Sequence, residues 1–191
     1  MINPYVLPPD LPRPVDDGAC NHLAGMAMPN IMLPSTAGLK VDLAALPSGR
    51  TVVYCYPRTG RPGEQMPEGW DQIPGARGCT PQSCSFRDHH RELADLGAGV
   101  FGLSAQSTAE QREVVERLHL PFELLSDVEL RFARALRLPT FEAGGMTLIK
   151  RLTLVVRDGV IEHVFYPVFP ANQSAEQVVL WLRRNLMTPS R

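Results

Sequence analysis

The sequence predicts an α/β fold in which a mixed β-sheet is flanked by helices on both faces. Residues 51–56, TVVYCY, form a continuous run of apolar, β-branched and aromatic side chains, which is typical of a strand covered on both faces. Asp158-Gly159 joins two apolar runs, 151–157 and 160–165, and is a strong signal for a β-hairpin. Residues 174–186 place apolar side chains at i, i+3, i+4 and i+7, which indicates an amphipathic helix packed on that sheet.

The remaining elements follow in chain order. The domain begins near Pro29 with two short strands that form an N-terminal β-hairpin. We expect these strands at 30–33 and 40–43, a helix at 79–96, a strand at 99–104, and two further helices at 109–118 and 127–136. A βαβ unit is thus joined to a ββα unit, which is the arrangement of a thioredoxin-like fold.

The domain organisation is one folded unit with an arm and an insertion. Residues 1–22 are rich in proline and predict an extended N-terminal arm, either draped over the domain or disordered, and residues 23–191 form the domain itself. Residues 60–77 form a long connection before the helix at 79, whereas such connections usually have about 2–6 residues. Trp70 and Ile73 supply apolar anchors, so an ordered flap is favoured over an inert insertion.

Composition excludes several classes of function. The 191 residues carry a formal net charge of −1 with 20% charged residues and no cluster of Lys and Arg, which argues against a nucleic-acid surface. No stretch is apolar enough to span a membrane, and the N-terminus lacks the basic and apolar regions of a secretory signal. Four cysteines without a regular framework suit a reducing compartment, so we expect a cytoplasmic protein.

The most informative motif is GCTPQSC at residues 78–84, in which four residues separate two cysteines. If Thr80 is the N-cap and Pro81 the first helical residue, Cys79 lies at the mouth of the helix, where free backbone N–H groups and the helix dipole favour a thiolate. In an intact helix Cys84 lies about 7.5 Å further along the axis and about 140° around it, whereas a disulfide needs converging side chains and Cα atoms within about 7 Å. The spacing favours a reactive thiol whose partner meets it only after local unwinding.

Two other interpretations of these cysteines remain open at this point. Both cysteines are half-buried structural residues in the first. In the second they form a metal site with His89 and His90, although this order lacks the paired spacings of common zinc modules. Cys20, in the arm, is either incidental or an alternative partner for Cys79, and Cys55 is expected in the core.

Five segments, in order, resemble motifs of the peroxiredoxins, and most of all those of the PrxQ (bacterioferritin-comigratory-protein) branch. The resemblance covers roughly residues 23–187. The segments are AMPNIML at 27–33, VYCYP at 53–57, GCTPQSC at 78–84, LLSD at 124–127 and RLTL at 151–154. Each is weak alone, but five in order at suitable separations are specific.

The resemblance implies a peroxidase that uses neither a metal nor an organic cofactor. Cys79 matches the peroxidatic cysteine and Cys84 the resolving cysteine, while Arg151 matches the active-site arginine and Pro57 the proline that shields the thiolate. The alternative interpretation of Arg151 is a surface charge at the end of a strand.

One family position departs from the pattern. The family places a threonine three residues before the peroxidatic cysteine, where this chain has Ala76. Thr59 stands two residues after Pro57, and the insertion separates it from Cys79. Thr59 is therefore the candidate hydroxyl if the insertion loops out and returns, and Thr80 is the alternative.

The resemblance further implies that hydrogen peroxide, organic hydroperoxides or both oxidise Cys79 to a sulfenic acid, which condenses with Cys84 to an intramolecular disulfide. A thioredoxin- or glutaredoxin-type partner would then reduce that disulfide, and the protein would be a monomer or a homodimer. Four large side chains, Met66, Trp70, Phe86 and Phe141, either line an apolar entrance for organic hydroperoxides or belong to the core. Two alternatives remain: a redox sensor or adaptor, and a scaffold adapted to another thiol-dependent, for example biosynthetic, reaction.

Overall fold

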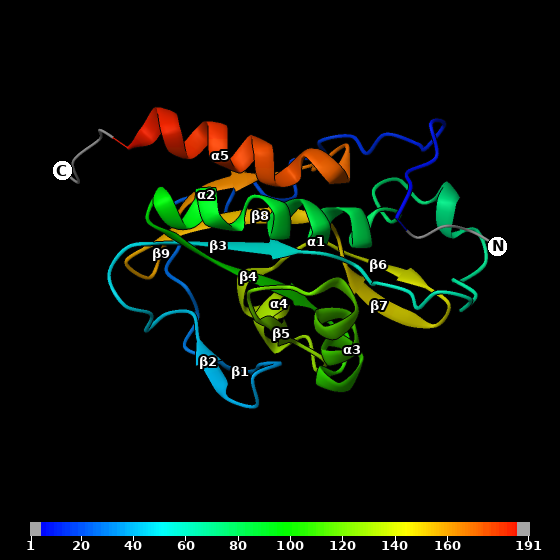
Figure 1. Ribbon diagram of the computed structural model, residues 1–191, viewed down its shortest axis with the longest axis horizontal. Helices are drawn as coiled ribbons and strands as arrows, with labels where there is room; N and C mark the ends of the chain where they lie inside the picture. The colour runs from blue at the N-terminus through cyan, green and yellow to red at the C-terminus, as the bar shows by residue number, and fades with distance from the viewer. Residues whose placement is uncertain (1–4, 187–191) are drawn as a thin grey trace.

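A central mixed sheet organises the molecule, whose computed structural model describes residues 5–186 (Figure 1). Its five strands lie in the order β5-β4-β3-β8-β9, where β4 is parallel to both β3 and β5, and the pairs β3–β8 and β8–β9 are antiparallel. The bounds are Arg50–Cys55 for β3, Ala98–Ser104 for β4, Leu124–Ser126 for β5, Leu152–Arg157 for β8 and Val160–Phe165 for β9. The predicted mixed sheet and its hairpin at Asp158-Gly159 are confirmed.

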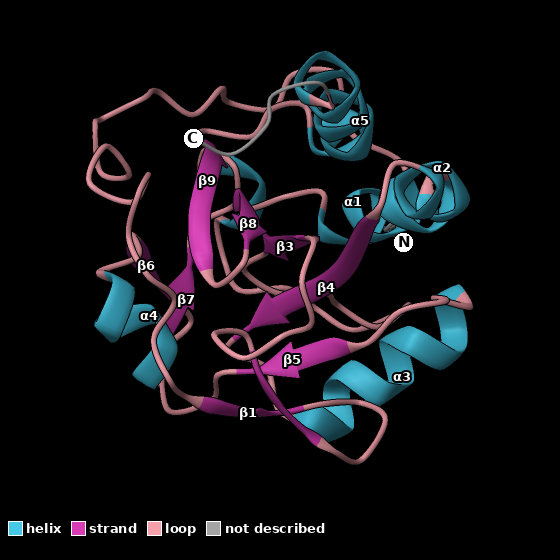
Figure 2. Ribbon diagram, turned by 90° about the vertical axis from the view of Figure 1, so that its left-hand side faces the viewer, coloured by secondary structure: helices cyan, strands magenta, loops and turns pink. Residues whose placement is uncertain are grey.

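Helices cover both faces of this sheet (Figure 2). One apolar cluster joins the sheet to α1 (Cys79–Asp88), α2 (His90–Asp95), α3 (Thr108–Leu118) and α5 (Ser174–Asn185). The cluster on the opposite face contains α4 (Arg131–Leu136) together with side chains from the N-terminal hairpin, β1 (Met32–Pro34) and β2 (Lys40–Asp42). The chain also contains two 3-10 turns, η1 (Trp70–Gln72) and η2 (Ala171–Gln173).

The helix expected at 79–96 is divided in two at His89. The backbone of His89 has φ −97° and ψ 5°, outside the helical region, and its Nδ1 lies 2.9 Å from the carbonyl oxygen of Ser85. A side chain that competes for a helical carbonyl favours such a break. The expectation of one continuous helix is therefore wrong, although Gly97 ends the second segment as expected, with φ +73°.

The helix expected at 127–136 is also shorter than predicted. It begins at Arg131, because the Asp127 carboxylate stands outside the helix and accepts hydrogen bonds from the backbone N–H groups of Phe132 (3.0 Å) and Ala133 (2.8 Å). An aspartate placed in this way satisfies the free donors of the first turn.

The structure contains a further hairpin that the sequence analysis does not predict. Strands β6 (Thr140–Ala143) and β7 (Met146–Ile149) form a separate two-stranded antiparallel sheet, and Gly144 and Gly145 turn between them with φ +56° and +72°. The Gly-Gly pair was the available signal, since a two-residue turn with positive φ at both positions favours glycine. This hairpin supports the insertion at 60–77 and therefore belongs to the setting of the site.

Within residues 5–186, no helix combines the length and apolar character that crossing a membrane requires.

Candidate active site

Cys79 is the first residue of α1, and the N-cap is Gly78 rather than the expected Thr80. Gly78 has φ +108°, and a Cβ added there would lie 2.8 Å from Cβ of Ala171 and 2.9 Å from Cδ2 of Leu7. Both the conformation and the close packing require glycine. The sulfur thus sits two positions deeper in the first turn than predicted, still beside the free N–H groups of the helix N-terminus.

Arg151 brings a permanent positive charge to that sulfur. It lies immediately before β8, and because β8 pairs antiparallel with β3, Arg151 stands near the end of β3 from which the chain leads to α1. Its Nη2 is 3.2 Å from Sγ of Cys79, and the residue is only 3% exposed. The interpretation of Arg151 as a surface charge is wrong.

The same guanidinium also holds the end of the insertion. Arg151 donates from Nε to the carbonyl oxygen of Gly75 (3.2 Å), and from Nη2 to those of Ala76 (3.1 Å) and Arg77 (3.2 Å). The rigid fork of arginine donors suits such a cluster of carbonyls, which a single ammonium group could not serve in the same way. Arg151 therefore ties residues 75–77 to the same place as the sulfur.

Gln82 orients Arg151 and was not singled out from the sequence. Its Oε1 accepts a hydrogen bond from Nη1 of Arg151, and its Nε2 donates to Oγ of Ser174 (3.2 Å) at the start of α5. Gln82 lies three residues after Cys79, on the same face of α1, and this i, i+3 spacing was the signal that could have identified it.

The other cysteines occupy apolar surroundings. Cys84 is half-buried on α1, and burial raises the pKa of its thiol. Burial raises the pKa of Cys20 to about 12 and also that of Cys55. Cys20 packs in the core cluster, so the idea of a mobile thiol in the arm is wrong, whereas the expected core position of Cys55 is confirmed. All four cysteines are free thiols.

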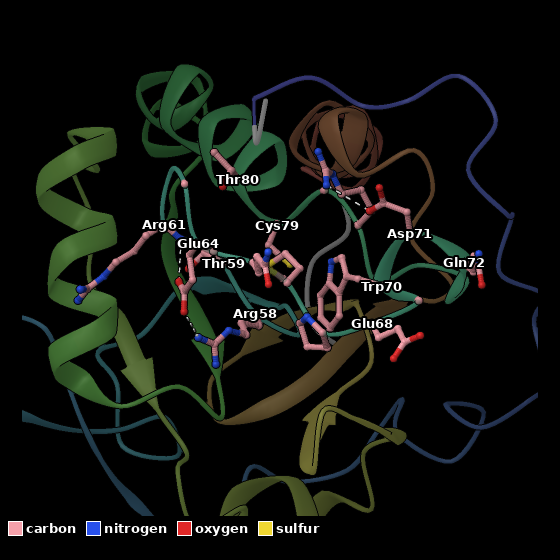
Figure 3. A pocket seen from close by; sticks show the side chains of 18 residues that line it. Arg58, Thr59, Arg61, Glu64, Glu68, Trp70, Asp71, Gln72, Cys79 and Thr80 are labelled. Carbon is pink, nitrogen blue, oxygen red and sulfur yellow. Dashed lines mark hydrogen bonds and ion pairs between the residues drawn. The ribbon is translucent and has the colours of Figure 1, made fainter. Parts of the chain in front are cut away.

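A cavity of about 690 Å³ opens beside Cys79 (Figure 3). Residues 58–61, 63–72 and 77–80 line it, so the insertion provides most of its wall. Thr59 and Thr80, the two candidate hydroxyls, both line this cavity together with Cys79. Thr59 is 3% exposed. Pro57 is buried in the bend after β3, two residues earlier.

The insertion, here called the flap, packs against the β6–β7 hairpin. Trp70 and Ala76 pack with Ala143 and Leu148 of the β6–β7 hairpin, and the Trp70 ring lies 6.1 Å from that of Phe141. Met66 and Trp70 line the cavity, as expected of an apolar entrance.

Phe86 does not belong to this entrance. It is fully buried and stacks on Tyr54 with ring centroids 4.4 Å apart, so of the two alternatives for this residue the core position is the one observed.

Two ion pairs lie among the charged side chains that line the cavity. Arg58 contacts Glu64 at 3.1 Å, and Arg77 contacts Asp71 at 3.2 Å. Opposite charges so paired leave the wall of the cavity close to neutral, which suits an uncharged ligand better than an ionic one.

The metal interpretation finds no support in the geometry. Among residues 5–186 no group of three or more His, Cys, Asp or Glu side chains is placed to hold a metal ion. His89 instead directs Nδ1 to a carbonyl of its own helix, and the His90 ring lies 5.8 Å from that of Phe122.

Comparisons with known sequences agree on one family. The model of the Redoxin family matches residues 23–179. The chain is 32% identical over 142 residues to peroxiredoxin Q, chloroplastic, of Oryza sativa subsp. japonica, which covers 74% of this chain but 58% of that relative. It is 29% identical over 166 residues to peroxiredoxin Bcp of Escherichia coli (strain K12), covering 85% of this chain and 96% of the relative.

Solved structures show the same fold. The peroxidoxin BcpB of Mycobacterium tuberculosis superposes with a TM-score of 0.70 at 25% identity, covering 85% of this chain and 98% of that one. The peroxiredoxin Q of Xanthomonas campestris gives a TM-score of 0.69 at 20% identity, covering 86% and 98%. The predicted thioredoxin-like fold is confirmed.

Proposed function

The chain belongs to the Redoxin family, as the resemblance to peroxiredoxins predicted, and we propose that it is a thiol-dependent peroxidase of the peroxiredoxin Q and Bcp kind. The single observation that carries the proposal is the contact of 3.2 Å between Nη2 of Arg151 and Sγ of Cys79, at the start of a helix and beside an open cavity. This arrangement stabilises negative charge on sulfur where a small substrate can reach it.

Ionisation of the sulfur alone does not make a fast peroxidase. A free cysteine is already a few per cent thiolate at neutral pH, so complete ionisation gains at most about 30-fold in rate. The remaining acceleration must come from stabilising the transition state, in which charge moves from sulfur to the departing oxygen. Arg151 and the backbone N–H groups of the first turn of α1 are the fixed donors available for that purpose.

The proposed first step is an attack of the Cys79 thiolate on the terminal oxygen of the peroxide. The S–O bond forms as the O–O bond breaks, and the departing oxygen takes up a proton and leaves as water or an alcohol. Cys79 is thereby oxidised by two electrons to a sulfenic acid. Pro57, buried in the bend after β3, is assigned to shielding the sulfur, and Thr59 to holding the peroxide.

The proposed second step joins Cys79 to Cys84. Five positions along α1 separate their Cα atoms by about 7.5 Å along the axis, so the first turn must open before the sulfurs meet. Condensation of the sulfenic acid with the Cys84 thiol forms a disulfide and releases water. A dithiol reductant of the thioredoxin or glutaredoxin type then restores both thiols by exchange and is itself oxidised.

The location, the substrates and the oligomeric state of the protein are also proposed. We assign the protein to the cytoplasm, where a reducing environment maintains four free thiols. The substrates are hydrogen peroxide and organic hydroperoxides, in keeping with the near-neutral, partly apolar cavity wall. The oligomeric state is proposed as a monomer or a homodimer.

A coupled assay with thioredoxin, thioredoxin reductase and NADPH tests the proposal. Cys79→Ser is expected to abolish NADPH consumption on addition of hydrogen peroxide or cumene hydroperoxide, because no sulfenic acid forms. Cys84→Ser is expected to form one sulfenic acid per chain, seen as a gain of one oxygen in the intact mass, and then to stall. Cys20→Ser is the matched control, since this buried cysteine lies in the core cluster and should leave turnover unchanged.

Full turnover in Cys79→Ser would reject the site, and an unmodified protein inert to every peroxide would reject the function. Slow recycling with a long-lived mixed disulfide to one partner protein would instead favour the redox sensor predicted as an alternative. Inertness to peroxides together with rapid alkylation of Cys79 would favour another thiol-dependent reaction.

A further inference from the structure

We infer that Gln106 is a positioning residue that holds Thr59 at the cavity and leaves its hydroxyl oxygen as a hydrogen-bond acceptor for the peroxide. The inference rests on the proposed function and deepens it, because it states how this chain places a group that its insertion has separated from Cys79. Gln106 lies in the connection between β4 and α3, far in the sequence from both residues.

The insertion raises the question of what holds Thr59 near Cys79. The flap at 60–77 lies between Thr59 and Cys79, so the start of α1 cannot set the position of Thr59 through a short loop. Thr59 nevertheless lines the same cavity as Cys79 (Figure 3). Some contact outside the flap must therefore fix Thr59.

Three hydrogen bonds join Gln106 to Thr59. Oε1 of Gln106 accepts from the backbone N–H of Thr59 (2.9 Å) and from its hydroxyl (3.0 Å), while Nε2 donates to its carbonyl oxygen (3.1 Å). Every polar group of Thr59 is thus engaged by one amide. Both residues are almost fully buried, with exposed fractions of 4% for Gln106 and 3% for Thr59.

The backbone of Thr59 determines the orientation of the amide. A backbone N–H only donates, so the amide atom facing it must be the oxygen, and a carbonyl only accepts, so the atom facing it must be the nitrogen. The amide oxygen carries no hydrogen, hence the hydroxyl of Thr59 must donate its single hydrogen to Gln106. The lone pairs of that hydroxyl remain free to accept a hydrogen bond from the cavity.

Gln106 is itself held firmly. Its backbone N–H donates to Oγ of Ser104 (3.3 Å), and its carbonyl oxygen accepts from Oγ of Ser126 (2.7 Å). Ser104 and Ser126 lie at the paired ends of β4 and β5, so the rigid sheet fixes Gln106, and Gln106 fixes Thr59.

The chemical consequence is a defined orientation for an organic hydroperoxide. Such a molecule has one O–H group, on the terminal oxygen that is transferred to sulfur. An acceptor at Thr59 binds that hydrogen and keeps the terminal oxygen on the Thr59 side of the cavity, while the donors of Arg151 favour the developing negative charge. If the Thr59 hydroxyl kept its hydrogen free, it could donate to either peroxide oxygen and would not select the orientation of the peroxide.

The test compares two reactions of the same sulfur in a Cys84→Ser background, where the protein stops after one oxidation. Gln106→Met, similar in volume but without hydrogen bonds, is expected to lower the rate constant for cumene hydroperoxide by roughly 10- to 100-fold. The rate constant for iodoacetamide, which needs the sulfur but no peroxide orientation, is expected to change by less than about twofold.

The matched control is Gln111→Met. Gln111 is fully buried near the same strand ends, where Nε2 donates to Oγ of Ser104 (3.1 Å) and to the carbonyl oxygen of Leu125 (2.8 Å). Its loss is expected to reduce stability without changing the ratio of the peroxide and iodoacetamide rate constants. A merely structural role of Gln106 would make both variants behave alike.

A double substitution separates action through Thr59 from any other action. If Gln106 acts by holding Thr59, Thr59→Val combined with Gln106→Met reacts with peroxide as slowly as Thr59→Val alone, and no slower. Rate losses that multiply would overturn the inference.

Gln106→Glu keeps the test decisive if the Met variant does not fold. A neutral carboxyl reproduces the donor and the acceptor of the amide, whereas its ionised form opposes the carbonyl of Thr59 with a second oxygen. The ratio of peroxide to iodoacetamide rate constants is expected to fall with rising pH in this variant and to stay constant in the parent. If this ratio does not change with pH in Gln106→Glu, the inference about Gln106 is overturned but the proposed function is not. If the parent protein does not react with peroxide, the proposed function is overturned as well.

Discussion

Arg151 combines two roles in one side chain. It contacts the sulfur of Cys79, and it binds three consecutive carbonyl groups, at residues 75–77, that end the flap. A change at this position therefore affects both the charge at the site and the position of the flap. The two effects are separable, because one appears in the rate of reaction and the other in stability.

Arg151→Lys is expected to lower kcat/KM for peroxide by about 100-fold, because an ammonium group cannot reach the sulfur and all of these carbonyls together. The free energy of unfolding is expected to fall by roughly 1–3 kcal/mol, since buried carbonyls lose their donors. Stopped-flow kinetics and urea denaturation measure the two effects. A variant with unchanged kcat/KM would show that the guanidinium does not act on the sulfur.

Burial raises the pKa of the three remaining thiols, whereas the sulfur of Cys79 lies beside the Arg151 guanidinium and Cys79 lines the cavity. At pH 8, iodoacetamide is expected to modify Cys79 while Cys20 and Cys55 stay unmodified, because burial raises the pKa of Cys20 to about 12 and also raises that of Cys55. The raised pKa of Cys84 means that its thiolate fraction still increases at pH values where an exposed cysteine is already ionised, so its alkylation rate should keep rising there. Peptide mass spectrometry measures each site, with urea-unfolded protein as the control. Rapid modification of Cys20 in the folded protein would contradict this prediction.

At the scale of elements, the N-terminal arm lies across the start of α1. Leu7 packs against Gly78 and Pro14 against Gly75, while Arg13 lies over the ring of Phe169 at 5.5 Å. Asp17 anchors the arm by contacts of 3.1 Å with Lys150 and 2.9 Å with Tyr166. The arm thus covers the turn that must open before Cys79 and Cys84 can meet.

Asp17→Asn is expected to loosen the arm and to speed disulfide formation severalfold after oxidation of Cys79. The hydrogen bond from Lys150 is the main cause that lowers the pKa of Asp17 to about 2. A carboxyl whose pKa is lowered on folding adds stability above its ordinary value, and that stability is lost as pH falls from about 4 towards 2. The variant should mimic this loss at neutral pH.

Asp16→Asn is the control, since among residues 5–186 the Asp16 carboxylate accepts a local hydrogen bond from the backbone N–H of Gly18 and none from Lys150 or Tyr166. Hydrogen exchange of residues 5–19 and intact-mass kinetics of disulfide formation measure the outcome. Equal behaviour of the two variants would show that the arm does not restrain α1.

At the scale of the molecule, the site joins the central sheet to a helix that would have to unwind in part for the proposed disulfide to form. β3 lies between β4 and β8 at the centre of the sheet, and its residues from Thr51 to Cys55 are buried. Phe86 packs α1 onto this sheet by stacking on Tyr54, so we expect the proposed unwinding to be confined to the turns before it. A local change of this kind leaves the rest of the fold in place.

Peroxide-treated protein is therefore expected to exchange the backbone amide hydrogens of residues 79–84 faster than reduced protein, while β3 and β8 exchange as slowly as before. Hydrogen exchange followed by mass spectrometry measures this, and Cys84→Ser, which forms no disulfide with Cys79, is the control. Unchanged exchange in α1, or a global increase, would contradict the proposed unwinding.

The sequence by itself determined the sheet, its main helices and the reactive motif. Continuous apolar runs, the Asp158-Gly159 turn and the periodicity of 174–186 are local patterns, and local patterns are readable without coordinates. The GCTPQSC motif likewise placed both cysteines on one helix, and five ordered segments pointed to Arg151.

Only the tertiary structure decided how the site is held together. Arg151 meets Cys79 across 72 positions of sequence, and Gln106 meets Thr59 across 47. The N-cap at Gly78 depends on packing against Leu7 and Ala171. Such contacts depend on how the sheet brings distant strand ends together, because hydrogen bonds and close packing act over a few ångströms of space and carry no signature in the neighbouring residues.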